Sequence, residues 1–357
     1  MVAFGCALIG RGTSTAAAQS PAQIQVQSQV QSQRQQSLEF VGSTADSLAF
    51  RALEQPFVNR ILADRSFAVV KMELRAASEA ELIGRDLLDR TSSGKVGFTA
   101  LRVTQFSPTE AWFDLADLTG LALDVPSARL VAAGYRDRAA TLFQEKFGLR
   151  LLALAAVQAQ ALYCRSSFAR LADIKGRKIR TDGAMQAALI ESLGGSAHRM
   201  PLAEVRSALA SKTIDCAIGG TMTGNQARWH EVSSHLFSLP LAWELIHYAV
   251  AEKTWASLPP TERQALQSEF RNFEARVWES ALVYTREGIN CNAGVEPCRS
   301  GQAGRMNVVI GGDSDRAALL KTMNESVLPA WSSRCAGACS STFNQTLAKL
   351  VGMKSIK

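Results

Sequence analysis

The stretch that decides the fold covers residues 171–223 and reads LADIKGRKIRTDGAMQAALIESLGGSAHRMPLAEVRSALASKTIDCAIGGTMT. Strand patterns at residues 178–180 and 213–218 flank two helix patterns. The first helix pattern is capped by Asp182 and runs to Leu193, and the second begins at Pro201. A strand, helix, helix, strand order is a crossover connection, so we expect the two strands to be parallel neighbours in one sheet.

The ends of these two strands indicate a ligand site. Arg180 ends the first strand, and a loop rich in glycine and threonine, residues 219–223, ends the second. Ligands of parallel sheets bind beyond the carboxyl ends of the strands. A guanidinium offers two parallel charge-assisted hydrogen bonds to a carboxylate, and small loop residues let backbone N–H groups approach it. The alternative is that Arg180 is an ordinary strand-end arginine in a surface ion pair.

The composition limits how many domains the chain can form and which partners are expected. The chain has 357 residues, of which 47% are hydrophobic and 20% are charged, which is enough for two domains with sizeable cores. The net charge is +7, but no dense block of lysine and arginine with interleaved aromatic residues is present. Nucleic acid is therefore not an expected partner, whereas a diffuse positive field suits a small anionic ligand.

The N-terminus has the features of an export signal. Residues 2–10 are apolar, and three alanines at positions 16–18 offer a cleavage site, so we predict a signal over residues 1–18. The alternative is an irregular cytosolic terminus. Residues 19–37 are rich in glutamine and are predicted to be a flexible leader. No other stretch approaches the ~20 uncharged residues of a membrane span, so we expect a soluble, exported protein that is not embedded in the membrane.

Cysteine usage agrees with export. Apart from Cys6 in the predicted signal, the even count of six suggests disulfides, for which sequence alone allows 15 connectivities. Local spacing favours Cys291–Cys298 and Cys335–Cys339, which leaves Cys164 and Cys216 as the third pair. Two alternatives remain: a structural zinc bound by the last four cysteines, or buried free thiols at the first two.

Strand and helix patterns alternate along the chain, which is typical of an α/β protein. Strands are predicted at residues 38–42, 68–74, 95–101 and 149–157, and helices at 46–63, 79–89, 128–147 and 313–331. A long helix is predicted from Pro260 to about Glu287, because apolar residues recur on one face at spacings of three and four: Leu266, Phe270, Phe273, Val277 and Ala281. We divide the chain into a first lobe (38–157), a second, ligand-clamping lobe (158–250) and a C-terminal part (251–357) that holds this helix and the last cysteine pairs.

Motifs of catalysis are missing from the sequence. There is no G-x-S-x-G, H-E-x-x-H or phosphate-binding loop, and the four histidines form no metal pair by spacing. The spacing of Cys335 and Cys339 is C-x3-C, whereas redox-active pairs are C-x-x-C. We therefore predict no enzymatic activity and no cofactor. The alternative is a thiol-redox or metal-dependent enzyme that uses the cysteines.

Several motifs in this order resemble a known family. DIKGRKIR at residues 173–180, a helix that ends in LGG at 193–195, PLAEVRSALASKTIDCAIGG at 201–220 and WHEV at 229–232 are similar to the solute-binding receptors of TRAP transporters, the DctP-type family. The resemblance is continuous over about residues 171–266 and extends in outline from residue 38.

This resemblance implies a fold and a function. The fold would be a two-lobed α/β fold like that of periplasmic binding proteins, each lobe a mostly parallel sheet flanked by helices, joined by linking strands and a long helix. The function would be capture of a small organic acid in the periplasm and its delivery to the membrane subunits of a TRAP permease. A ligand-binding receptor for a sensor system on the same fold is the alternative.

The resemblance also carries site residues onto this chain. The carboxylate-binding arginine of the family falls on Arg180, and a second family arginine falls on or near Arg165. A family polar contact falls at Gly219 instead of the asparagine found in many members, so a nearby polar side chain is expected to replace it: Thr221, Thr223 or Asn225. The first lobe would contribute Arg102 and Gln105. Trp243 is an aromatic candidate, although such tryptophans more often pack in a core.

Overall fold

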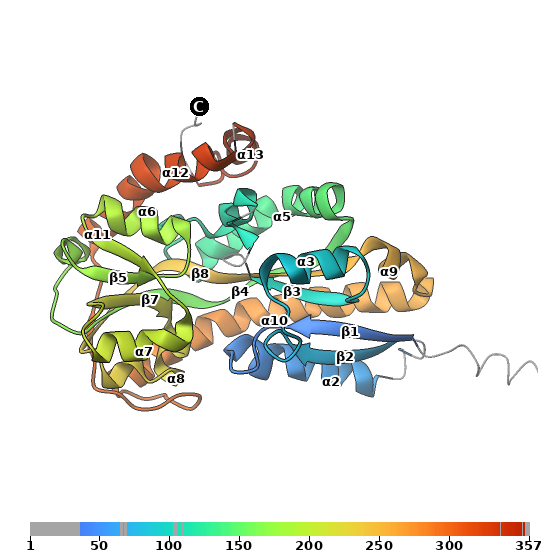
Figure 1. Ribbon diagram of the computed structural model, residues 1–357, viewed down its shortest axis with the longest axis horizontal. Coiled ribbons are helices and arrows are strands. Elements are labelled where there is room, and N and C mark those ends of the chain that lie inside the picture. Colours follow the sequence, from blue (N-terminus) through green and yellow to red (C-terminus); the bar gives the residue numbers. More distant parts are fainter. Residues whose placement is uncertain are drawn as a thin grey trace, which may run out of the picture.

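The computed structural model describes residues 36–64, 67, 70–102, 106–108, 110–335, 337–351 and 353. The predicted signal and nearly all of the predicted leader lie outside these residues. A nine-stranded sheet runs through the molecule in the order β2-β1-β3-β8-β4-β7-β5-β6, and β9 pairs with β8 (Figure 1). The strands are β1 (Gln36–Gly42), β2 (Val70–Ala76), β3 (Phe98–Arg102), β4 (Leu149–Cys164), β5 (Lys178–Thr181), β6 (Ser196–Arg199), β7 (Cys216–Gly220), β8 (His235–Ala251) and β9 (Asn307–Val309).

The first lobe is built on the parallel strands β2, β1 and β3. Helix α2 (Gln55–Ala63) continues from the π-helical turn η1 (Ala49–Glu54), and α3 (Gly84–Ser92) and α9 (Glu252–Ser257) complete this end of the molecule (Figure 1). The sheet packs through aromatic side chains: the rings of Phe57 and Phe270 lie 4.8 Å apart, and those of Phe98 and Phe270 lie 5.8 Å apart. This packing joins the lobe to the helix that contains Phe270.

The second lobe contains the crossover unit of residues 171–223. Strands β5 and β7 are parallel neighbours, with Ile179 opposite Cys216, as predicted. Helices α6 (Ala184–Ser192) and α7 (Leu202–Ala210) make the crossover. Two details differ from the prediction. The N-cap of α6 is Gly183, not Asp182. The short edge strand β6, whose sequence SAHR carries no apolar alternation, was not expected.

Strands β4 and β8 connect the lobes. They have 16 and 17 residues, run antiparallel to each other, and pair with strands of both lobes. Their pairing is interrupted by register shifts between Leu151/Ala153, Ala156/Ala159 and Gln160/Leu162. β4 is a single strand where we predicted one that ended at residue 157, so the predicted division between residues 157 and 158 falls inside it. The α/β fold of two lobes and linking strands is confirmed.

A long helix also spans the molecule. Helix α10 (Pro260–Ala293) has 34 residues and runs along the sheet from one lobe to the other (Figure 1). Its predicted apolar face is buried, because Leu266, Phe270, Phe273 and Val277 are each at most 2% exposed. The helix continues six residues past the predicted end and stops at Gly294, whose φ of 74° is left-handed.

The remaining helices cover the sheet. Helix α5 (Val125–Phe147) precedes β4, and η2 (Ala111–Asp117) precedes α5. The predicted helix at residues 313–331 is divided into α11 (Asp313–Thr322), the π-helical turn η5 (Met323–Val327) and α12 (Leu328–Ser332), and α13 (Ala338–Thr346) follows. The other short elements are α8 (Thr221–Gln226), η3 (Leu171–Ile174), η4 (Trp229–Glu231) and η6 (Ser333–Cys335). Of the helices in the described ranges, none has both the length and the apolar composition needed to cross a membrane.

All six cysteines outside the predicted signal are paired. The disulfides are Cys164–Cys216, Cys291–Cys298 and Cys335–Cys339, as the spacing favoured. The alternatives of free thiols and of a zinc site formed by the last four cysteines are therefore wrong. Within the part of the chain that the structure describes, no cluster of three or more histidine, cysteine or acidic side chains is arranged to hold a metal ion.

Candidate functional site

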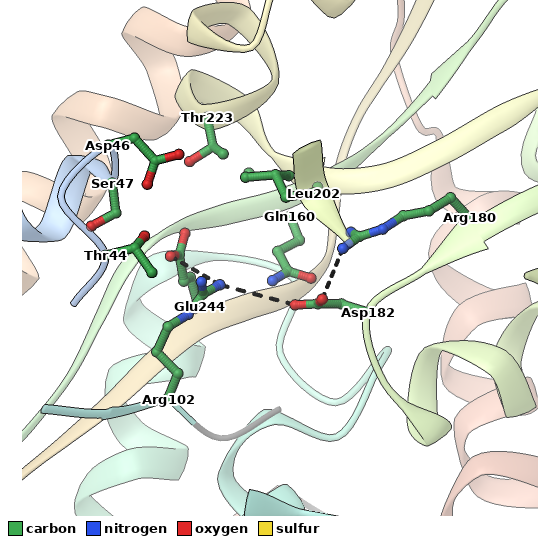
Figure 2. A pocket seen from close by; sticks show the side chains of 12 residues that line it. Thr44, Asp46, Ser47, Arg102, Gln160, Arg180, Asp182, Leu202, Thr223 and Glu244 are labelled. Carbon is green, nitrogen blue, oxygen red and sulfur yellow. Dashed lines mark hydrogen bonds and ion pairs between the residues drawn. The ribbon is translucent and has the colours of Figure 1, made fainter. Parts of the chain in front are cut away.

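A small polar cavity lies where the two lobes meet on the linking strands. It has a volume of about 60 Å³. The first lobe provides the loop after β1 and the end of β3, the second lobe provides the ends of β5 and β7 and the starts of α7 and α8, and β4 and β8 provide one residue each. The lining residues are Thr44, Asp46, Ser47, Arg102, Gln160, Arg180, Asp182, Leu202, Gly219, Gly220, Thr223 and Glu244 (Figure 2).

Arg180 is the most buried charged side chain of this cavity, with only 3% of its surface exposed. Its Nε donates to the carbonyl of Met200 at 3.1 Å and its Nη1 to the carbonyl of Ile218 at 2.8 Å, so the side chain is held by both neighbouring strand ends. Burial lowers its pKa, and the nearby carboxylate of Asp182 opposes that effect. An arginine remains charged at neutral pH even so. The cavity therefore contains a fixed positive charge.

Asp182 connects this charge to a second one. Its Oδ1 accepts from Nη2 of Arg180 at 2.8 Å, and its Oδ2 lies 3.9 Å from Nη2 of Arg102. Its backbone N–H donates to Oε1 of Gln186 at 2.8 Å, and the Gln186 amide in turn donates to Oε1 of Gln160. These contacts explain why Asp182 does not cap α6: its carboxylate is directed toward the guanidinia in the cavity (Figure 2).

Arg102 comes from the first lobe and pairs with Glu244 of β8. The two side chains are 3.1 Å apart between Nη2 and Oε1. Burial lowers the pKa of Arg102, but the carboxylates of Glu244 and Asp182 more than offset burial, and the pKa is raised. The Nε of Arg102 is buried and has no hydrogen-bond partner among the residues described.

Gln158 of β4 organises the opposite wall. Its Oε1 accepts from the backbone N–H groups of Met222 at 2.7 Å and Thr223 at 3.2 Å, at the start of α8. Its Nε2 donates to Oγ1 of Thr223 at 2.6 Å and to Oε2 of Glu244 at 3.0 Å. One buried amide therefore fixes both the start of α8 and the carboxylate that faces Arg102, which keeps these polar groups paired away from water.

The glycines of the loop are required by close packing. A Cβ on Gly220 would lie 2.5 Å from Cδ of Gln158, and a Cβ on Gly219 would lie 2.5 Å from the ring of Trp229. No side chain fits at either position without moving a buried neighbour. The sequence pointed to this loop because small residues let backbone N–H groups approach a ligand, whereas the structure shows that lack of space decides the residue type.

The first-lobe edge of the cavity is held by a buried carboxylate. Glu54 is fully buried and accepts from the backbone N–H of Ser43 at 2.7 Å, the hydroxyl of Ser43 at 2.8 Å and the hydroxyl of Tyr248 at 3.1 Å. Burial raises its pKa, and these hydrogen bonds oppose the effect. The contacts fix the start of the loop that carries Thr44, Asp46 and Ser47 relative to β8.

The cavity brings together four of the residues predicted from sequence, namely Arg102, Arg180, Gly219 and Thr223. Arg165 is not with them: its Nη2 pairs with Asp215 at 3.1 Å and its Nε donates to the carbonyl of Ile214 at 3.1 Å, at the far end of β4 and β7. The pair ties two strand ends together and leaves Arg165 outside the cavity lining.

Three other predicted residues serve the surrounding structure. Thr221 is buried, and its hydroxyl faces the carbonyl of Tyr284 on α10 at 3.4 Å. Asn225 is fully buried and exchanges two hydrogen bonds with the backbone of Gln302. Trp243 packs in the core and donates from Nε1 to the carbonyl of Ala122 at 3.0 Å. Gln105 lies outside the residues that the structure describes.

Sequence reasoning missed the acidic side of the site. Asp182 was interpreted as a helix cap and Asp46 as the start of a helix, and Glu244 was not singled out. One signal was available: a carboxylate inside a buried apolar run, such as Glu244 in SLPLAWEL, is rare unless it is paired.

Comparisons with known proteins were made against families, curated proteins and solved structures. The family model described as "Bacterial extracellular solute-binding protein, family 7" (DctP) matches residues 45–290. No curated protein matches the chain. Solved structures match over most of their length. An extracytoplasmic solute receptor from Bordetella pertussis, DctP7, which binds pyroglutamic acid, is 17% identical, with a TM-score of 0.73, over 87% of this chain and 99% of that chain.

Two further structures are of TRAP periplasmic solute-binding proteins. The one from Desulfovibrio salexigens, with bound orotic acid, is 15% identical, with a TM-score of 0.75, over 88% of this chain and 98% of that chain. The one from Shewanella oneidensis, with bound succinate, is 16% identical, with a TM-score of 0.68, over 88% of this chain and 97% of that chain. These likenesses establish a shared fold.

Proposed function

Because the chain belongs to the bacterial extracellular solute-binding proteins of family 7, we propose that it captures a small organic acid in the periplasm and delivers it to the membrane subunits of a TRAP-type permease. The proposed ligand contacts are Arg180, Arg102, Gly219 and Thr223. Arg165, Thr221, Asn225 and Trp243 support the structure around them. The protein acts as a receptor and has no catalytic role.

The observation that carries this proposal is the hydrogen bonding of the buried Arg180 side chain. A guanidinium has five N–H donors, and the described contacts use three of them, to Met200, Ile218 and Asp182. Among the described contacts, one N–H of Nη1 and one N–H of Nη2 are not used, and a carboxylate can accept from two guanidinium N–H groups. A fixed, buried cation with two such donors beside a cavity is suited to recognising a carboxylate.

The ligands of structurally similar proteins support the same chemistry. The structures from Bordetella pertussis, Desulfovibrio salexigens and Shewanella oneidensis hold pyroglutamic acid, orotic acid and succinate, all of which carry a carboxylate. Identities of 15–17% do not carry a ligand over to this chain, so the argument rests on the local geometry of Arg180.

The test is isothermal titration calorimetry of the mature chain with a panel of small carboxylates. We expect Arg180→Ala to weaken binding by about 30-fold or more, because a bidentate charged contact contributes about 2–5 kcal/mol. The matched control is Arg165→Ala, which removes a strand-end arginine of the same lobe that does not line the cavity. Tight binding that survives Arg180→Ala would contradict the proposal.

A further inference from the structure

The cavity contains more acid than base. Its described lining includes three carboxylates, Asp46, Asp182 and Glu244, and two guanidinia, Arg102 and Arg180. With all five ionised, the formal charge is 2 − 3, or one net negative charge. A site built to hold an anion alone would be expected to have the opposite balance, because a buried ligand charge needs a compensating charge in the protein.

Carboxylates of the protein already neutralise both guanidinium groups of the cavity. Arg180 is paired with Asp182 at 2.8 Å, and Arg102 is paired with Glu244 at 3.1 Å and lies 3.9 Å from Asp182. A carboxylate that enters the cavity therefore shares each guanidinium with a carboxylate of the protein. The like-charge repulsion between them raises the free energy of a bound simple anion.

Asp46 is the third acid and is the least engaged. Its side chain is exposed, and in the described part of the chain its carboxylate accepts no hydrogen bond, whereas its backbone carbonyl accepts from Nη2 of Arg51 at 3.0 Å. Its described electrostatic partner is the Arg102 guanidinium, which Glu244 already pairs more closely. Figure 2 shows Asp46 and Glu244 on one side of the cavity and Arg180 on the other, with Gln160 between them.

We propose that the ligand is a small zwitterion, an amino acid or a close relative, whose carboxylate binds Arg180 and whose ammonium group lies between Asp46 and Glu244. This proposal rests on the proposed function and specifies its ligand class. An ammonium group offers hydrogen bonds to carboxylates, and its positive charge cancels the charge of the ligand's own carboxylate. A zwitterion therefore leaves the net charge of the lining at minus one, whereas a plain acid makes it minus two. The cavity volume of about 60 Å³ favours a ligand with a short carbon skeleton.

The two charged ends of such a ligand would bind different parts of the molecule. Arg180 belongs to β5 of the second lobe, Asp46 to the loop after β1 of the first lobe, and Glu244 to β8 between them. A zwitterion therefore adds a first-lobe contact, through Asp46, to the guanidinium contacts that any carboxylate could make.

The experiment uses matched triplets of ligands and isothermal titration calorimetry on the mature chain. Each triplet contains an amino acid, the acid that lacks its amino group and the amine that lacks its carboxyl group, such as alanine, propionate and ethylamine, or proline, cyclopentanecarboxylate and pyrrolidine. The panel covers standard amino acids and 4-aminobutyrate. We expect at least one amino acid to bind about tenfold or more tightly than both of its partners.

Three outcomes would overturn the inference. Plain acids that bind as tightly as their amino acids would refute the zwitterion and leave the proposed function intact. Amines that bind as tightly as their amino acids would refute carboxylate recognition. If neither acids nor amino acids bind, the proposed function fails and the inference fails with it.

Substitutions then locate the ammonium group. Asp46→Asn and Glu244→Gln should each reduce the ratio of amino-acid to plain-acid affinity by about tenfold, because each removes one charged acceptor. The plain acid itself should bind more tightly to both variants, because each substitution removes a negative charge from the cavity lining. Asp215→Asn is the matched control, since Asp215 is an aspartate paired with an arginine outside the cavity. A ratio that both variants leave unchanged would overturn the assignment, and thermal melts would show that each variant is folded.

Discussion

Arg180 and Asp182 form an ion pair of 2.8 Å although only Thr181 separates them in the chain. Alternate residues of an extended segment lie on the same side, so the end of β5 directs both side chains into the cavity. The protein thus places its own carboxylate on the guanidinium that we propose for the ligand. We therefore expect Asp182 to compete with the ligand, so that its charge limits how strongly the site binds an acid.

Removing this competitor should strengthen the binding of plain acids. We expect Asp182→Asn to increase the affinity for a simple carboxylate about five- to twentyfold, because the substitution removes a negative charge next to both guanidinia. Titration calorimetry with propionate and succinate measures the change, and Asp215→Asn is the control with an unchanged affinity. Weaker binding in Asp182→Asn would mean that Asp182 orients Arg180 and does not compete with the ligand.

Arg165 should matter for stability and not for binding. Its guanidinium ties the end of β4 to Ile214 and Asp215, so Arg165→Ala is expected to lower the free energy of unfolding by about 1–2 kcal/mol. Ligand affinity should stay within about twofold of the original, because no contact of Arg165 reaches the cavity lining. Chemical denaturation and calorimetry on the same sample separate the two effects. A large loss of affinity with unchanged stability would place Arg165 in the site.

The contact between α10 and α8 should not tolerate a methyl group. A Cβ on Gly288 would lie 2.4 Å from the backbone nitrogen of Met222 and 2.5 Å from the carbonyl carbon of Thr221. Backbone atoms cannot move aside as a flexible side chain can, so we expect Gly288→Ala to destabilise the protein by about 1–3 kcal/mol. It should also weaken ligand binding, because α8 carries Thr223.

Gly312→Ala is the control for this substitution. A Cβ on Gly312 meets nothing within 4 Å, and the backbone conformation at Gly312 is extended, which any residue adopts. Thermal melts of both variants measure the difference. Equal melting temperatures for the two would contradict the packing argument.

His247 should make stability depend on pH. Its ring is fully buried against Phe113 and Phe143, and burial lowers its pKa from 6.5 to about 3. Between pH 3 and pH 6.5, His247 binds a proton in the unfolded chain but not in the folded chain. The contribution of neutral His247 to the free energy of unfolding is therefore fully present above pH 6.5. It is lost as the pH falls toward 3, by at most about 1.4 kcal/mol per pH unit.

His247→Leu removes this titration. In urea denaturation between pH 4 and 7, we expect the variant to lose part of the pH dependence of the free energy of unfolding, because leucine binds no proton in either state. A slope of stability against pH that is identical in the two proteins would contradict the assignment to His247.

Local sequence patterns were sufficient to predict the fold, because each of its main helices and strands is defined by residues that are close in sequence. The apolar positions of α10 recur at helical spacing, and two helix patterns separate the strand patterns of β5 and β7, so the crossover order alone predicts the parallel pair. Strand β6 was not predicted, because its four residues at the edge of the sheet bury little surface and show no alternation of polar and apolar side chains. The π-helical turn η5 interrupts a helical pattern that the periodicity describes as continuous.

The arginines and the glycine loop of the site were predicted, but its acidic side chains were not. Arg180 could be found because the end of its strand and the glycine loop are close in sequence. The pairing of Arg102 with Glu244 joins β3 to β8 and depends on tertiary structure that no local pattern contains. The same limit explains why Asn225 and Trp243 were predicted as ligand contacts. Their polar atoms form hydrogen bonds with Gln302 and Ala122, which are distant in sequence.

The two linking strands determine the order in which the chain can fold. Strand β3, at residue 102, finds its second neighbour only in β8, which ends at Ala251, and α10 covers the sheet later still. The first lobe therefore cannot complete its hydrogen bonding until almost all of the second lobe has been synthesised. The first lobe is not a continuous folding unit, and a fragment that ends before β8 would leave the edge of β3 unpaired and prone to aggregation.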